Sequence, residues 1–114
     1  MNPIQVIGID KLDSNELKIA NKLANEYYVK FQRAIKNITS LIIQIKIYQK
    51  GGSQKRFAIH SRVTSPGHHF ESTKAIDWDF ARTMHKSLQD IEREIEHKLH
   101  SSDQLTKILK KKEY

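Results

Sequence analysis

Apolar residues recur every three or four positions in two stretches of the chain, which is the spacing of one face of an α-helix. The first stretch follows Asp13 and runs to about Lys36, and the second runs from about Asp79 to about His100. Both predict amphipathic helices with one buried stripe. The expected buried residues are Leu17, Ala20, Leu23, Ala24, Tyr27, Phe31, Ala34 and Ile35 in the first helix, and Phe80, Met84, Leu88, Ile91 and Ile95 in the second.

Acidic residues mark the start of both predicted helices. Asp13 stands three residues before Glu16, which is the spacing of a capping box. Asp77 or Asp79 is expected to cap the second helix, because an aspartate at this position accepts hydrogen bonds from free backbone N–H groups. Trp78, between the two, is expected to pack against the edge of a sheet.

Elsewhere, apolar and polar residues alternate, which predicts strands with one buried face. The alternation is clear over 41–48 and over 56–63, and a turn signal at 65–67 precedes a weaker strand over about 69–74. A short apolar run at 4–8 predicts a first strand. The middle strands turn their polar side chains to one face, and these are Gln44, Lys46, Tyr48, Arg56, His60 and Arg62.

The predicted order is therefore β-α-β-β-β-α. Both helices have to bury an apolar stripe, so we expect a two-layer α+β sandwich with the two helices on one face of a four-stranded sheet. The other face of the sheet can stay exposed to solvent. Residues 1–100 form one domain in this interpretation, Ser101–Asp103 mark a break, and residues 101–114 form a basic tail.

The net charge of +7 is unevenly distributed. Residues 1–50 carry eight bases and four acids, whereas residues 76–100 carry four bases and six acids. On a helical wheel, basic residues nevertheless gather opposite both apolar stripes, and sorting by sign favours a polyanionic partner such as RNA. We expect the two stripes to merge into one surface; they consist of Lys18, Lys22, Arg33 and Lys36 in the first helix, and of Arg82, Lys86, Arg93 and His97 in the second.

Enzyme, cofactor and metal signals are weak. The chain has no cysteine, no glycine-rich phosphate loop and no nucleophile with its base at a recognisable spacing. Asp77 and Asp79 lack a third ligand, and the pairs His68–His69 and His97–His100 lack a completing acid. We therefore expect a cytoplasmic protein that is not an enzyme, with no catalytic residue, cofactor, metal or small-molecule substrate and no association with a membrane.

With this order, the chain resembles the ribosome hibernation-promoting factor family, also called ribosome-associated inhibitors or protein Y, in its short form. The resemblance covers about residues 4–100. It lies in the stretch Phe31–Ile38 just before the long strand and in Asp79–Ala81 at the start of the last helix. It implies a helical layer like that of double-stranded-RNA-binding domains.

The resemblance also implies a function and a site. The partner would be ribosomal RNA at the decoding region of the small ribosomal subunit, where the protein would exclude messenger and transfer RNA in stress or stationary phase. Off the ribosome the protein is expected to be monomeric. The chain departs from the family in its acidic last helix, with Asp90, Glu92, Glu94 and Glu96. Carried over by position, the RNA-binding residues would be Lys18, Lys22, Arg33, Lys36, Arg82, Lys86, Arg93, His97 and Lys98.

Two other functions fit the sequence. One is a module that binds structured RNA without selecting ribosomes, and the other is a protein-interaction domain that uses the open sheet face or a sheet edge. The open face mixes aromatic and basic residues, as single-strand binders do. A face decorated only for solubility is the simpler interpretation, because just one tyrosine, Tyr48, is expected there.

Overall fold

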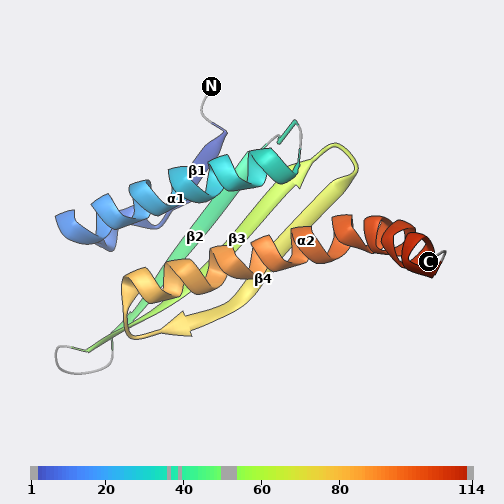
Figure 1. The fold of residues 1–114 in the computed structure, drawn as a ribbon. Helices are drawn as coiled ribbons and strands as arrows, with labels where there is room; N and C mark the ends of the chain where they lie inside the picture. Colours follow the sequence, from blue (N-terminus) through green and yellow to red (C-terminus); the bar gives the residue numbers. More distant parts are fainter. Residues whose placement is uncertain (1–2, 36, 39, 50–53, 113–114) are drawn as a thin grey trace.

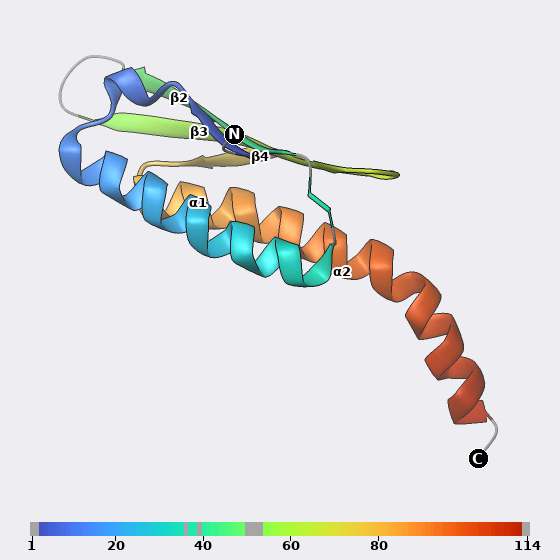
Figure 2. The ribbon, with the colours of Figure 1, turned by 90° about the horizontal axis from the view of Figure 1, so that it is seen from above.

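The structure is a computed structural model that describes residues 3–35, 37–38, 40–49 and 54–112, with side chains as far as Lys98. It contains two layers, a four-stranded sheet and two α-helices that lie side by side on one of its faces (Figures 1 and 2). The predicted β-α-β-β-β-α order and the α+β class are confirmed. The elements are β1 (Ile4–Ile7), a 3-10 turn (Ile9–Lys11), α1 (Ser14–Ala34), β2 (Ser40–Gln49), β3 (Lys55–Ser65), β4 (His68–Asp77) and α2 (Phe80–Lys112).

The strands follow one another across the sheet in chain order. β1 runs parallel to β2, while β2–β3 and β3–β4 are antiparallel. The parallel pair needs a crossover, and α1 supplies it. The register between β3 and β4 shifts between Ile59 and Ser61, so that β4 carries an extra residue at this point.

The hydrophobic core lies between the sheet and the two helices. Residues of β2, β3 and β4 and of both helices contribute to it, as the alternation and the helical spacing predict. The largest fully buried side chains are Phe31, Phe70, Leu41, Ile43, Ile59, Met84, Leu88, Ile91, Ile95 and Val63. Such burial removes a few kcal/mol of unfavourable hydration per large side chain, roughly 1.5–3.

Small polar side chains let α2 approach β3 and β4 closely. The Ser87 and Ser61 hydroxyls lie 2.7 Å apart, and the Ser87 hydroxyl also donates to the Ile59 carbonyl at 3.3 Å. The Thr83 hydroxyl donates to the Asp79 carbonyl at 2.6 Å. These buried polar groups therefore keep hydrogen-bond partners inside the core, which avoids the cost of burying them unpaired.

The ends of the helices follow the predicted caps. The Asp13 carboxylate accepts from the Glu16 N–H at 2.7 Å, and the Glu16 carboxylate accepts from the Asp13 N–H at 3.1 Å. At the second helix, Asp79 is the cap, since its carboxylate accepts from the Arg82 N–H at 2.8 Å. Of the two predicted candidates, Asp77 instead accepts from the N–H groups of Trp78 and Asp79 just before the helix.

One glycine is required by the fold. Gly8 has a φ of +90° and lies against β2, where a Cβ atom would collide with the Ile45 carbonyl oxygen. Both the left-handed backbone and the close approach favour glycine. The turn from β1 into the crossover helix therefore depends on this position.

Several predicted boundaries are wrong. α1 ends at Ala34, and Ala34 is exposed because no described part of the chain covers that side of its last turn. β4 extends to Asp77, well beyond the predicted end. α2 continues through Ser101–Asp103 to Lys112, since serine and aspartate weaken a helix but do not stop it as proline does. Figure 2 shows these last turns curving away from the sheet.

Candidate nucleic-acid interface

The outer face of α1 carries exposed cations. Lys18, Lys22 and Arg33 lie opposite the buried stripe, and none of them forms an ion pair with another described side chain. The fourth predicted residue of this stripe, Lys36, lies outside the described residues. We call Lys18, Lys22 and Arg33 the α1 cation face. Its charges are free to contact phosphates, because no carboxylate among the described side chains pairs with them.

The cations of α2 are largely compensated. The Lys86 ammonium pairs with the Asp77 carboxylate at 2.8 Å, and an Arg93 nitrogen lies 4.0 Å from an Asp90 oxygen. The Lys86 hydrogen bond, together with the backbone N–H of Trp78, lowers the pKa of Asp77 to about 2. Arg82 is exposed and has no ion pair with a described residue. It is therefore the best placed of the predicted α2 contacts for a phosphate.

His97 and Lys98 lie over the β4 side of the molecule. Together with residues of β4 they line a shallow depression that also contains two carboxylates, Glu71 and Glu94. The Lys98 ammonium lies 5.5 Å from the centre of the Phe70 ring. This end of the α2 stripe therefore borders a surface of mixed charge beside β4.

The seam between the helices is built around Tyr27. Its hydroxyl lies 2.9 Å from Nδ1 of His85, which joins α1 to α2. Burial raises the pKa of Tyr27, and the nearby carboxylates of Glu92 and Glu26 raise it further. Charges of both signs therefore lie near this seam, since the Lys30 ammonium is also 4.8 Å from the centre of the Tyr27 ring.

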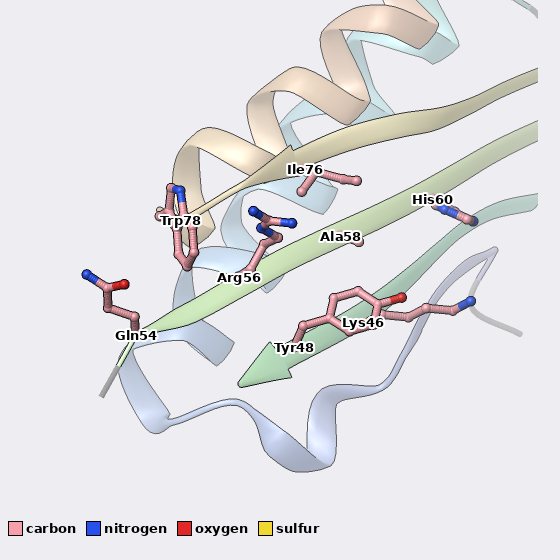
Figure 3. Close-up of a pocket in the computed structure, with 8 residues that line it drawn as sticks. All are labelled: Lys46, Tyr48, Gln54, Arg56, Ala58, His60, Ile76 and Trp78. Carbon is pink, nitrogen blue, oxygen red and sulfur yellow. The ribbon is translucent and has the colours of Figure 1, made fainter. Parts of the chain in front are cut away.

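The open face of the sheet contains a second candidate site, a hollow of about 540 Å³ over β2, β3 and the end of β4 (Figure 3). Two aromatic residues, Tyr48 and Trp78, stand at its sides with 52% and 56% of their surface exposed. The Arg56 guanidinium lies 4.8 Å from the centre of the Trp78 ring. None of the described lining residues is acidic, and they are Lys46, Tyr48, Gln54, Arg56, Ala58, His60, Ile76 and Trp78.

The sequence predicted only part of this hollow. Lys46, Tyr48, Arg56 and His60 lie on the open face as expected. Ile76 comes from the part of β4 that was not predicted, and Trp78 comes from the position just after the strand. Trp78, which was expected to pack against the edge of a sheet, is 56% exposed and lies beside Arg56 of β3 (Figure 3). Continuing the strand pattern of β4 past residue 74 is the signal that would have placed both residues here.

Arg62, the last predicted residue of the open face, belongs to a separate cluster. Its Nε atom lies 3.0 Å from the Glu71 carboxylate, which His69 also contacts at 3.0 Å. The hydrogen bond from His69, with the charge of Arg62, lowers the pKa of Glu71. This cluster therefore offers little free positive charge.

Metal and membrane chemistry find no support in the described residues. No group of three His, Asp or Glu side chains gathers there at a spacing that could hold a metal ion. Neither helix, over the residues described, has a segment that is long and apolar enough to cross a membrane.

Two comparisons with known proteins found no match. No protein-family model matches the chain. No curated protein matches it either. The fold and the exposed cations define a small two-layer α+β domain with a basic helical face, and a fold alone does not specify a function.

Proposed function

We propose that this chain is an RNA-binding protein of the cytoplasm that associates with the small ribosomal subunit and inhibits translation by occlusion. The observation that carries the proposal is the α1 cation face, where three exposed cations have no described ion-pair partner. We propose ribosomal RNA as the partner because the chain resembles hibernation factors. The protein would act by occupying a site and would catalyse no reaction.

Binding would draw its free energy mainly from phosphate contacts. Each cation that neutralises a phosphate releases condensed counterions, so affinity falls as salt rises. Lys18, Lys22 and Arg33 are spread along α1 between its first and last turns, so that they track a backbone rather than a single phosphate. Arg82 adds a contact from α2. Lys86 contributes less because the Asp77 carboxylate already pairs with it, and Arg93 is partly screened by Asp90, 4.0 Å away.

The proposal is tested by co-sedimentation of the protein with purified small ribosomal subunits across a salt series. The experiment is repeated with the decoding region filled by messenger and transfer RNA. We expect saturable binding near one copy per subunit that weakens with salt and is lost when the region is filled. Absence of binding at low salt would contradict the proposal.

A second outcome favours an alternative. Affinity for small subunits that equals the affinity for bulk duplex RNA would indicate a module for structured RNA in general. The same free cations of α1 support that alternative. The measurement therefore needs a duplex RNA of matched length in parallel.

A further inference from the structure

The hollow on the open sheet face is built from two adjacent rows of residues. Tyr48 pairs with Arg56 across β2 and β3, and Trp78 directly follows Asp77, the partner of Phe57 on β4. In the next row, Lys46 pairs with Ala58, and Ala58 pairs with Ile76. Neighbouring strands lie about 4.8 Å apart, so the two aromatic positions are separated by roughly 10 Å across β3.

A small residue makes the floor of this hollow. Ala58 points to the open face but is only 4% exposed, because the longer side chains around it stand higher. Figure 3 shows Tyr48 and Lys46 on one side of Ala58, and Arg56, Trp78 and Ile76 on the other. The space of about 540 Å³ falls in the range of small-ligand sites, and a nucleobase fits it.

The chemistry of the walls is cationic and aromatic. Lys46 and Arg56 contribute positive charge, His60 adds a hydrogen-bonding ring, and the described lining contains no carboxylate. Of the two acids that flank Trp78, Asp77 pairs with Lys86 and Asp79 caps α2. An anion with a flat apolar part complements these walls, since the rings offer stacking surfaces and the cations offer phosphate contacts.

We propose that this hollow binds single-stranded RNA, with one base stacked against Trp78 or Tyr48 and the flanking phosphates at Lys46 and Arg56. Single-stranded segments present unstacked bases to aromatic side chains, whereas a duplex hides them. Two exposed rings favour a nucleic acid over an acidic peptide, which would use the cations and leave the rings unpaired. The site lies on the face of the sheet opposite α1, and it stands whether or not the chain binds ribosomes.

The tryptophan offers a direct readout. Trp78 is the only tryptophan in the sequence, so selectively excited tryptophan fluorescence reports on the hollow and not on the tyrosines of α1. An eight-nucleotide oligouridylate and an eight-nucleotide oligoadenylate are titrated into the full chain, alongside a duplex of the same length. We expect saturable quenching by the single strands and weaker quenching by the duplex. Quenching that is absent, or equal for the duplex, would overturn the proposal.

Matched tyrosine variants locate the binding. Tyr48→Ala removes an exposed ring of the hollow, while Tyr28→Ala removes a partly exposed ring of α1. We expect Tyr48→Ala to weaken oligonucleotide binding roughly five- to hundredfold, the range that loss of one stacked base gives, and Tyr28→Ala to leave it unchanged. Equal losses in the two variants would overturn the proposal.

Two further experiments distinguish binding in the hollow from binding at the α1 cation face, and RNA from an acidic protein as the ligand. Lys22→Gln/Arg33→Gln removes two charges of the α1 cation face, and we expect it to leave oligonucleotide quenching intact even if ribosome binding is lost. A polyglutamate peptide serves as the acidic-protein probe. Tighter quenching by the peptide than by the oligonucleotides would overturn the proposal and indicate a protein partner.

Discussion

The two helices lie in one layer and are both amphipathic, yet the cations on their outer faces differ in how they are paired. α1 and α2 both bury an apolar stripe against the sheet and both carry basic residues behind it. On α1 these cations have no described carboxylate partner, whereas on α2 Lys86 and Arg93 lie beside Asp77 and Asp90. Counting cations on a helical wheel therefore overestimates the α2 surface, because part of its charge is neutralised by groups that the wheel does not include.

The largest expected effect comes from removing charge on α1. Lys22→Gln/Arg33→Gln should lower affinity for small subunits roughly ten- to hundredfold near 0.1 M salt and reduce the salt slope by about two, since two phosphate contacts are lost. The matched control is Lys86→Gln/Arg93→Gln, which removes the same net charge from α2. We expect the control to cost less than about threefold, because those cations are already paired. Affinity is measured by sedimentation or fluorescence anisotropy. Equal losses in the two variants would contradict the claim that α1 contributes more to RNA binding than α2.

The seam between the helices should matter for stability and not for RNA. Tyr27→Phe removes the hydroxyl that contacts His85 and should lower the free energy of unfolding by about 1 kcal/mol. Urea denaturation measures this, with Tyr28→Phe as the control, whose hydroxyl accepts only an exposed hydrogen bond from Gln32. A loss of RNA affinity in folded Tyr27→Phe would place the interface across the seam and contradict our account.

Neutralising an acid at the seam should make the α2 side of the helical layer more attractive to RNA. Glu92→Gln removes an α2 carboxylate whose charge acts on Tyr27 at the seam between the helices. We expect RNA affinity to rise by roughly twofold, since one repulsive charge beside the interface is removed. Asp10→Asn, which changes the same charge in the turn between β1 and α1, serves as the control. An equal rise in both variants would indicate a net-charge effect with no local origin.

The smallest effect concerns the ion pair that compensates Lys86. The pKa of Asp77 is lowered to about 2, so the charged carboxylate is favoured in the folded state. Its contribution to stability is fully present above its ordinary pKa of about 3.9 and is lost as the pH falls toward 2. Asp77→Asn should therefore flatten the decline in melting temperature between about pH 4 and pH 2. An unchanged decline would assign the acid sensitivity to other carboxylates.

Local patterns account for most of the fold. The helical spacing, the alternation in β2 and β3 and the Asp13–Glu16 capping box all depend on residues a few positions apart, and the structure agrees with each. The side of the sheet that stays open also follows from alternation. These features were predictable because propensity, periodicity and capping act within one element.

Contacts between elements explain what the sequence did not predict. The Lys86–Asp77 pair joins the first turns of α2 to the end of β4, and its compensation of charge depends on where the strand ends. Trp78 reaches the open hollow only because β4 continues to Asp77. The Glu92 carboxylate of α2 acts on Tyr27 of α1 only when the helices are docked. Each of these depends on tertiary arrangement, which no single stretch of sequence encodes.

Protection of individual lysines by the small ribosomal subunit tests the central claim most directly. The protein is acetylated briefly, with and without saturating small subunits, and the modification of each lysine is measured by mass spectrometry. The account predicts that Lys18 and Lys22 lose most of their reactivity on binding, and that Lys86 changes little because Asp77 already holds its ammonium. Unchanged reactivity of Lys18 and Lys22 in the bound protein would contradict the claim that the α1 cation face contacts RNA.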